Sequence, residues 1–406
     1  MRWKSQILAS RIRELELGDI NIVRALVKGV EFINLGYGEV DFDTPEHIRE
    51  AAKKALDEGF TRYVIPTEGF ADLREAIAEK LSRENGVDVH PDKEVLVTAG
   101  VQEGINLVMQ TLLNEGDEVI LTDPYYMVYP QAIRYAGGIP VFVQVKEERD
   151  FRIDPEDVED KVTSRTKLLV LVSPDNPTGA VLMKDDLEAI AEIALRHDLI
   201  VISDEIYEKF IFGDRRHYSI ASLPGMKERS IILNGFSKAY AMTGWRVGYM
   251  AADESYMEPI KRLHSNLVIC ATSIAQKAAL AALTGPQHYV EEFRKEFERR
   301  MNLAVNGLNR IHGIKCNKPG GSFYIFPNVK SFKIPSFQLA KHVVKDAKVL
   351  LYPGTAFGKG GEGYLRLSLT TSQDDIKEAL VRIRASVEKL NSNECRSLVA
   401  RERKTI

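Results

Sequence analysis

The chain has 406 residues, a formal net charge of −3 and an isoelectric point near 6.3, and 44% of its residues are hydrophobic. This length predicts two domains, the composition is that of a globular protein, and the charge gives no basic surface typical of nucleic-acid binding. Three scattered cysteines (Cys270, Cys316 and Cys395) predict neither a disulfide framework nor a metal site. No apolar run approaches the ~20 residues that span a bilayer, and Met1–Ser10 lacks a signal-peptide pattern, so we expect a cytoplasmic protein without a membrane partner.

A charged helix and the strand Glu31–Leu35 are expected near the start of the chain. The middle of the chain then alternates short β-branched runs with stretches of helical spacing, such as Val101–Leu113 and Lys184–His197. This alternation predicts a mainly parallel sheet covered by helices on both faces, in which ligands bind beyond the carboxyl ends of the strands. The expected strands are Glu94–Thr98, Glu118–Thr122, Pro140–Val145, Lys167–Val172, Leu199–Ser203, Ser230–Leu233 and Arg246–Ala251.

The pattern changes near Gly285. A long charged amphipathic helix over Tyr289–Ile311 is followed by short strands and a closing helix near Asp374–Leu390, and the polar tail Asn391–Ile406 is expected to fray. We therefore expect an α/β fold with a large sheet domain over residues 41–285 and a smaller α+β domain over 286–406. Residues 1–40 are expected to pack with the small domain.

Lys238 is the lysine with the strongest chemical context. It follows the apolar run Ser230–Asn234 and lies among small residues in the segment Gly235–Gly248, which also holds Ser237 and Arg246. Burial and a nearby cation would lower the pKa of this amine and make it a nucleophile able to form a Schiff base. The plainer alternative is a surface lysine in a strand-to-helix loop.

Two further loops offer groups that suit a flat anionic ligand. The turn from Val97 to Gly104 leads from a strand into a helix, and its free amides near Gly100, Val101 and Gln102 would bind an anion such as phosphate. Tyr126 follows the next strand and could stack on a planar ring. An ordinary strand–helix connection and a core tyrosine remain the alternatives.

Three more polar residues stand at or near strands. Asn176 lies in the rigid turn Ser173–Gly179 after a strand, and Asp204 ends an apolar strand, where a charge needs a partner unless the residue is only a helix N-cap. Tyr207 follows Asp204 and projects in a similar direction if a helical turn begins there. Arg366 lies in the strand-like run Tyr364–Ser368, where it would either grip a carboxylate or make a surface pair.

Taken together and in this order, these motifs resemble the class I aminotransferases, pyridoxal-phosphate enzymes of fold type I, near the aspartate aminotransferase branch. The resemblance covers nearly the whole chain, from Leu8–Arg11 to the last helix, and the lysine segment fits the family signature at every defined position. Asn34–Glu39, Tyr63 and Tyr352–Gly358 match as well.

By matching position, the resemblance implies that Lys238 forms a Schiff base with the cofactor pyridoxal 5′-phosphate. Asp204 would pair with the ring nitrogen, and Tyr207 and Asn176 would bond the ring oxygen. Tyr126 would stack on the ring.

The resemblance also implies the residues that hold the cofactor phosphate and the substrate. Residues expected at the phosphate are Gly100, Val101, Gln102, Ser237, Arg246 and, from the neighbouring subunit of a homodimer, Tyr63. The substrate α-carboxylate would be held by Arg366, Asn176 and the backbone of Gly36.

The chain departs from the family pattern at four places. Val40 replaces a proline, the segment Leu17–Asn21 is divergent and shorter, and Gln102 stands where some relatives that act on acidic substrates carry a lysine. These three differences weaken the expectation of strict aspartate specificity. Gly235 replaces a serine that often contacts the phosphate, which would loosen phosphate binding slightly.

The sequence therefore predicts an aminotransferase that moves an amino group between an L-amino acid and a 2-oxo acid, with 2-oxoglutarate as the expected acceptor. The alternative within enzymes is a carbon–sulfur lyase or racemase with the same cofactor. A non-catalytic regulator on this fold is disfavoured, because only a short stretch precedes the first matching motif. The amino donor is left open.

Overall fold

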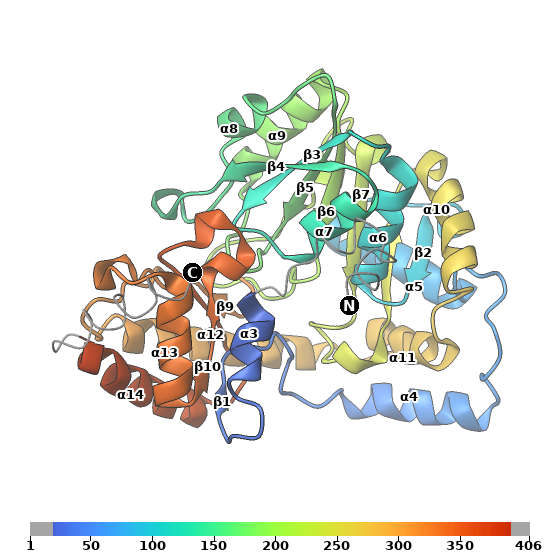
Figure 1. Ribbon diagram of the computed structural model, residues 1–406. Helices are drawn as coiled ribbons and strands as arrows, with labels where there is room; N and C mark the ends of the chain where they lie inside the picture. Colours follow the sequence, from blue (N-terminus) through green and yellow to red (C-terminus); the bar gives the residue numbers. More distant parts are fainter. Residues whose placement is uncertain (1–18, 391–406) are drawn as a thin grey trace, which may run out of the picture.

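The computed structural model describes residues 19–390, and a seven-stranded sheet forms its centre (Figure 1). The strand order is β2-β8-β7-β6-β5-β3-β4, and only β8 runs antiparallel to its neighbours. All seven expected strands are present, which confirms the mainly parallel α/β sheet. Their bounds are β2 (Val95–Thr98), β3 (Glu118–Asp123), β4 (Ile139–Gln144), β5 (Thr166–Val172), β6 (Ile200–Asp204), β7 (Ser230–Gly235) and β8 (Gly248–Ala251).

The expected start of the last strand at Arg246 is wrong. Arg246 has φ 52, in the left-handed region, because it ends the short helix η5 (Thr243–Trp245). A residue with that φ does not continue an extended strand, so β8 begins only at Gly248.

The central sheet is buried on both faces because its strands are apolar at successive positions. Along β7, Ile231 and Leu233 belong to the same hydrophobic cluster as Ile105 of α6. Ile232 lies on the other face and shares a cluster with Ala278 of α11. Successive side chains of a strand point to opposite faces, so such a strand needs helices on both sides. The helices are α3 (Asp19–Ala25), α4 (Glu46–Asp57), α5 (Ala71–Lys80), α6 (Val101–Leu112), α7 (Val128–Tyr135), α8 (Pro155–Glu159), α9 (Lys184–Arg196), α10 (Glu254–Leu267), α11 (Ser273–Thr284), α12 (His288–Leu308), α13 (Ser336–Ala347) and α14 (Gln373–Lys389).

The C-terminal part of the chain forms two small sheets against α12, α13 and α14. One is antiparallel, in the order β11-β12-β9, and the other joins β1 and β10 in parallel. Figure 1 shows the orange α13 beside the blue α3, and β1 pairs with β10, so the N-terminal segment lies against the C-terminal one. The strands are β1 (Ile33–Asn34), β9 (Tyr324–Ile325), β10 (Val349–Leu350), β11 (Tyr352–Pro353) and β12 (Leu365–Ser368).

Some sequence expectations lie outside the described residues. These are the matching motif Leu8–Arg11, the start of the divergent segment at Leu17, Cys395 and the polar tail Asn391–Ile406. Within residues 19–390, none of the helices combines the length and the apolar character that a membrane crossing requires.

Candidate active site

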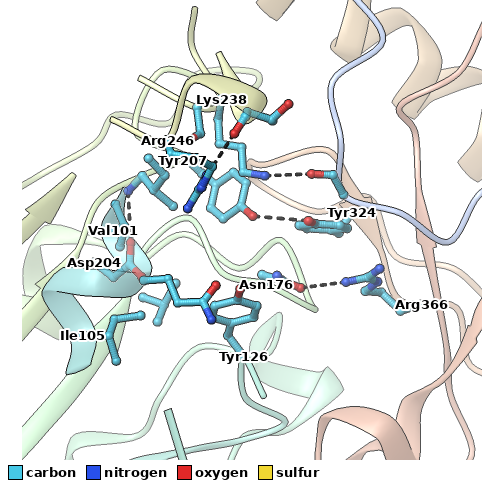
Figure 2. A pocket seen from close by; sticks show the side chains of 16 residues that line it. Val101, Ile105, Tyr126, Asn176, Asp204, Tyr207, Lys238, Arg246, Tyr324 and Arg366 are labelled. Carbon is cyan, nitrogen blue, oxygen red and sulfur yellow. Dashed lines mark hydrogen bonds between the residues drawn. The ribbon is translucent and has the colours of Figure 1, made fainter. Parts of the chain in front are cut away.

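A cavity of about 260 Å³ lies at the carboxyl ends of β5, β6 and β7, where a parallel sheet is expected to bind its ligand. Ten of the predicted site residues line it, and Gly36, Tyr63 and Gly100 do not. Figure 2 shows Lys238 and Tyr126 on opposite sides of the cavity, with Asp204 at one end and Arg366 at the other. The lining consists of Gly38, Val101, Gln102, Ile105, Tyr126, Val172, Asn176, Asp204, Ile206, Tyr207, Ser237, Lys238, Thr243, Arg246, Tyr324 and Arg366.

Lys238 reaches the cavity just after β7 ends at Gly235. Its Nζ donates a hydrogen bond to the carbonyl oxygen of Gly38 at 2.7 Å. Burial, together with the positive charges of Arg366 and Arg246, lowers the pKa of Lys238 to about 8. The alternative of a solvated surface lysine is therefore wrong, and the amine is neutral in a substantial fraction of molecules near pH 8.

Asp204 is almost completely buried at the end of β6. Its Oδ2 accepts a hydrogen bond from the hydroxyl of Tyr129 at 2.8 Å, and its Oδ1 accepts one from the backbone amide of Ile206 at 3.2 Å. Burial raises the pKa of Asp204 to about 6, although both hydrogen bonds oppose the rise. A carboxylate held this way is ionised at neutral pH and is suited to pair with a cation in the cavity.

The end of the cavity that suits an anion is built by the start of α6 and by Arg246. Gly100 has φ 82, and a Cβ atom at this position would lie only 2.5 Å from Nη2 of Arg246. Glycine therefore permits both the turn and the close approach of the guanidinium to the helix N-terminus. Val101, Gln102 and Ser237 line the same cavity, so helix amides, a hydroxyl and a cation converge where a phosphate would be stabilised.

Gly235 is required by the packing of two backbones. A Cβ atom there would lie 2.8 Å from the Cα of Gly248, on the neighbouring strand β8. The glycine at this departure from the family pattern is thus explained by the close contact between β7 and β8.

Arg366 enters the cavity from β12 and is only 5% exposed, so the alternative of a surface ion pair is excluded. Its Nη1 donates to Oδ1 of Asn176 at 3.2 Å, and its Nη2 donates to the carbonyl oxygen of Gly36. The guanidinium carbon lies 4.5 Å from the ring centroid of Tyr324. The Nε of Arg366 is buried without a hydrogen-bond partner, and the residue lines the cavity, where a guanidinium suits a carboxylate.

Tyr207 and Tyr126 both contribute rings to the cavity wall. The hydroxyl of Tyr207 lies 3.2 Å from that of Tyr324, and burial raises the pKa of Tyr207 well above its usual value. Burial likewise raises the pKa of Tyr126 to about 12, so both phenols stay protonated and can donate hydrogen bonds at neutral pH.

Two polar residues with a role in this geometry were missed by the sequence analysis. Tyr129 follows Tyr126 by one helical turn, which was the only available signal, and Tyr324 follows the glycine pair Gly320-Gly321 without any motif that marks it. A Cβ atom at Gly38 would meet the Tyr324 hydroxyl at 1.9 Å, so this glycine makes room for the tyrosine. Both tyrosines act through contacts between distant parts of the chain.

The predicted residues outside the lining differ in their surroundings. Gly36 and Gly100 adjoin the cavity through their contacts with Arg366 and Arg246. Tyr63 does not line the cavity of its own chain and is 70% exposed. Asp19, in the divergent segment, accepts a hydrogen bond from Thr355 at 2.6 Å and does not line the cavity.

The donor set fits pyridoxal phosphate. The cavity presents an amine of lowered pKa, a buried carboxylate suited to a protonated ring nitrogen, and a helix N-terminus suited to a phosphate, whose glycine leaves no room for a Cβ.

Comparison with known proteins agrees with this geometry. The family described as aminotransferase class I and II matches residues 30–383. Aspartate aminotransferase of Pyrococcus abyssi is 46% identical over 355 residues, which cover 87% of this chain and 91% of that protein. Aromatic-amino-acid aminotransferase 2 of Thermococcus litoralis is 44% identical over 379 residues, which cover 93% and 97%.

A solved structure shows the same fold. The aromatic aminotransferase from Pyrococcus horikoshii superimposes with a TM-score of 0.87 at 44% identity, over 91% of this chain and 99% of that one. These relatives confirm fold type I and an enzyme that transfers amino groups between amino acids and 2-oxo acids, rather than a lyase, a racemase or a regulator. Members of the family use pyridoxal phosphate for this reaction. The chain belongs to the class I pyridoxal-phosphate-dependent aminotransferases and is similar to their aspartate aminotransferase branch.

Proposed function

We propose that the cavity binds pyridoxal phosphate through Lys238 and carries out both halves of the amino transfer. The observation that carries this proposal is the buried amine of Lys238, with a pKa lowered to about 8, facing the same cavity as Asp204, Arg246 and Arg366. When bound, the cofactor supplies an electron sink for the bond-breaking step at the amino-acid Cα. The experiment that tests the attachment is the Lys238→Ala variant described in the Discussion.

The chain's residues hold the cofactor at its polar groups. Asp204 keeps a proton on the ring nitrogen through its negative charge, and Tyr207 and Asn176 donate hydrogen bonds to the ring oxygen. Tyr126 packs against the ring face. The phosphate is bound by the start of α6 (Gly100, Val101 and Gln102), by Ser237 and Arg246, and by Tyr63 of the neighbouring subunit.

With the cofactor bound, Lys238 would also serve as the base of the reaction. Its neutral Nζ would hold and move the proton of the substrate Cα, which is general acid–base catalysis by a group whose pKa lies near the working pH. Arg366, Asn176 and the backbone of Gly36 hold the α-carboxylate, so the Cα is oriented toward the amine.

We further propose a broad range of amino donors, with 2-oxoglutarate as the usual acceptor. Among the described residues, the cations that line the cavity are Lys238, Arg246 and Arg366. Lys238 attaches the cofactor, Arg246 binds its phosphate and Arg366 binds the α-carboxylate, so none of them is left for a second carboxylate of the substrate. Gln102 occupies the position where a lysine would bind that carboxylate. The names of the relatives, which include aspartate and aromatic aminotransferases, support a range of side chains.

Arg366→Lys should weaken the binding of every substrate alike. A lysine cannot reproduce the two parallel hydrogen bonds of a guanidinium, and losing charge-assisted contacts at this buried site should cost about 1.5–3 kcal/mol. The measurement is kcat/KM for aspartate, glutamate, alanine and an aromatic amino acid, each with 2-oxoglutarate as acceptor.

The matched variant is Gln102→Lys, which should instead raise kcat/KM for aspartate and glutamate relative to alanine. If the unmodified protein preferred aspartate by several orders of magnitude, the proposal of a broad donor range would be wrong. If Arg366→Lys affected only one substrate, its role at the shared α-carboxylate would be wrong.

We also propose that the active unit is a homodimer with shared sites. Tyr63 is 70% exposed and Ile65 is 84% exposed, although both are large and apolar. Their loop lies beside a second exposed apolar run, Leu267–Ile269, since the amide of Val64 contacts Sγ of Cys270 at 3.3 Å. An exposed apolar patch of this kind is typical of a protein interface.

Mixing two inactive chains should therefore restore activity. In a dimer of Lys238→Ala with Tyr63→Ala, one of the two shared sites carries neither defect, so we expect up to half of the normal activity per hybrid dimer. The assay compares the mixture, after dissociation and reassociation, with each variant treated alone. A fully active monomer in analytical ultracentrifugation would contradict the shared site.

Two broader expectations stay proposals. We propose the division into a large domain over residues 41–285 and a small domain over 286–406 with the N-terminal segment 1–40. The pairing of β1 with β10 supports it. A cytoplasmic location is supported by Cys270 and Cys316, which are both free thiols, as is usual in a reducing compartment.

A further inference from the structure

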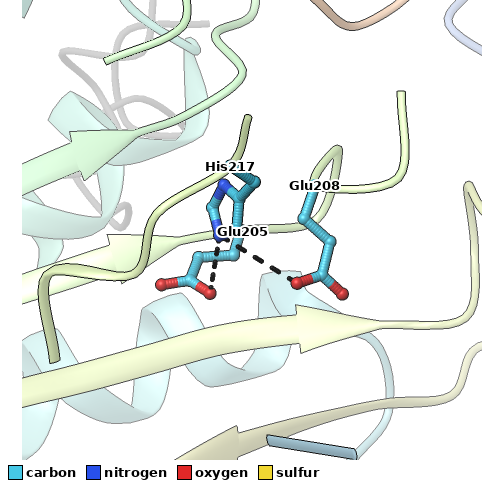
Figure 3. A group of neighbouring side chains, drawn as sticks. All are labelled: Glu205, Glu208 and His217. Atoms are coloured by element: carbon cyan, nitrogen blue, oxygen red, sulfur yellow. Dashed lines mark hydrogen bonds and ion pairs between the residues drawn. The ribbon is translucent and has the colours of Figure 1, made fainter. Parts of the chain in front are cut away.

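A second group of buried charges lies behind the cavity, on the far side of the end of β6. Glu205, Glu208 and His217 place ligand atoms within 4.8 Å of one another (Figure 3). A metal ion does not explain this group, because its oxygens are already satisfied. Nζ of Lys80 bonds one oxygen of Glu208, and Nδ2 of Asn85 donates to the other at 2.8 Å. The group is therefore an internal charge network.

Glu205 is the centre of this network and has an exposed fraction of 0%. Its Oε1 accepts hydrogen bonds from the hydroxyls of Ser203 at 2.8 Å and Ser219 at 2.6 Å. Its Oε2 accepts from Nδ2 of Asn85 at 2.8 Å and faces Nε2 of His217 at 3.1 Å. Four donors are what an ionised carboxylate takes, so the geometry stabilises a buried negative charge here.

Glu205 directly follows Asp204, and the two side chains point in opposite directions. Asp204 faces the cavity, whereas Glu205 lies on the side of Ser203, as expected where a strand alternates its side chains.

Glu208 differs from Glu205, because the negative charge of Glu208 is compensated by the ammonium group of Lys80. Although burial opposes it, Lys80 and His217 lower the pKa of Glu208 to about 2.

We propose that Glu205 is a positioning residue for the reaction. Its four hydrogen bonds fix the end of β6, and its charge strengthens the hold of Asp204 on the proton of the cofactor's ring nitrogen. This inference rests on the role proposed for Asp204. It assigns a function to a buried carboxylate that does not touch the cavity.

The effect of the Glu205 charge on Asp204 has the direction that this role requires. Burial is the main reason that the pKa of Asp204 is raised to about 6, and the charge of Glu205 contributes to the rise. A negative charge behind Asp204 makes an unpaired Asp204 carboxylate less favourable and makes a cation beside it more favourable. The protonated ring nitrogen is that cation.

The test compares the dissociation constants of pyridoxal phosphate and 1-deazapyridoxal phosphate, whose ring has a C–H in place of the nitrogen. The ratio of the two constants measures the preference for the ring nitrogen and does not depend on turnover. Glu205→Gln should lower this preference about three- to tenfold, where tenfold corresponds to a shift of one pKa unit. Glutamine fits the site because the hydroxyls of Ser203 and Ser219 can accept from its amide as well as donate.

Two variants separate charge from packing. Glu205→Asp keeps the charge and should retain most of the preference. Glu147→Gln is the matched control, because Glu147 is also buried and accepts hydrogen bonds from Asn328 and Tyr364, but does not adjoin the cavity. It should leave the preference unchanged. An unchanged preference in folded Glu205→Gln, or an equal loss in Glu205→Asp, would overturn the inference.

Asp204→Asn in the same series tells the two proposals apart. If it keeps the full preference, the role of Asp204 fails and this inference fails with it. If it loses the preference while Glu205→Gln keeps it, only this inference fails. Should Glu205→Gln not fold, Glu205→Asn replaces it and is compared with Glu205→Asp, which has the same size and keeps the charge. Glu205→Asn should lower the preference about three- to tenfold relative to Glu205→Asp; no difference would overturn the inference.

Discussion

Lys238→Ala is expected to abolish turnover and to leave any bound pyridoxal phosphate removable by dialysis. The variant removes the amine that attaches the cofactor and the base that moves the Cα proton, and the loss of general acid–base catalysis alone is worth about 10²–10⁴-fold. The structure supports both roles, because the Nζ has a pKa lowered to about 8 and donates a hydrogen bond to the carbonyl oxygen of Gly38.

The attachment point is measured directly by borohydride reduction of the loaded protein and peptide mapping. We expect the label on the peptide that holds Lys238. Lys209→Ala is the matched control, since this partly exposed lysine pairs with Glu84 at 2.6 Å and should be replaceable without loss of turnover. A label on any other lysine would show that the assignment is wrong.

Asp204→Asn is expected to lower kcat by about 10²–10³-fold, which is typical when a preorganised electrostatic group is removed. Asparagine keeps the size of the side chain, and its single amide oxygen can still accept the hydrogen bond of the Ile206 amide, while its NH2 group would face the Tyr129 hydroxyl, which can accept as well as donate. The main loss is the negative charge that holds the ring-nitrogen proton.

Tyr207→Phe provides the comparison. It removes one neutral hydrogen bond, worth about 0.5–1.5 kcal/mol, and should slow the reaction by about tenfold at most. The measurement is the steady-state kcat of both variants with saturating cofactor, and we expect the loss in Asp204→Asn to be much larger than the loss in Tyr207→Phe. A near-normal rate for Asp204→Asn would rule out the role of its charge.

Much of the fold was predictable because it depends on local patterns. The β-branched runs gave all seven central strands, and the change of pattern near Gly285 marked the start of a different architecture. The strand start expected at Arg246 is wrong for a local reason as well, namely the left-handed backbone conformation of this residue, with φ 52. The residue types around an arginine do not indicate such a conformation.

The residues of the site also fall into those that a local pattern predicts and those that depend on contacts between distant segments. Lys238, Asp204 and Asn176 were found because each lies at or just after the end of a strand, and the carboxyl ends of parallel strands meet at one edge of the sheet. Tyr129 was missed because its role depends on a hydrogen bond to Asp204, which lies 75 positions away along the chain.

The sequence by itself thus determined the class of fold, the lysine and the order of the polar loops, since these follow from spacing and residue type along one stretch of chain. Only the tertiary structure decided which charges are buried, which donors satisfy them and which remain free. It separated the carboxylate of Asp204, which faces the cavity, from that of Glu205, which four donors hold behind it. The physical reason is that burial and hydrogen bonding set the behaviour of a charge, and both arise from contacts between distant segments.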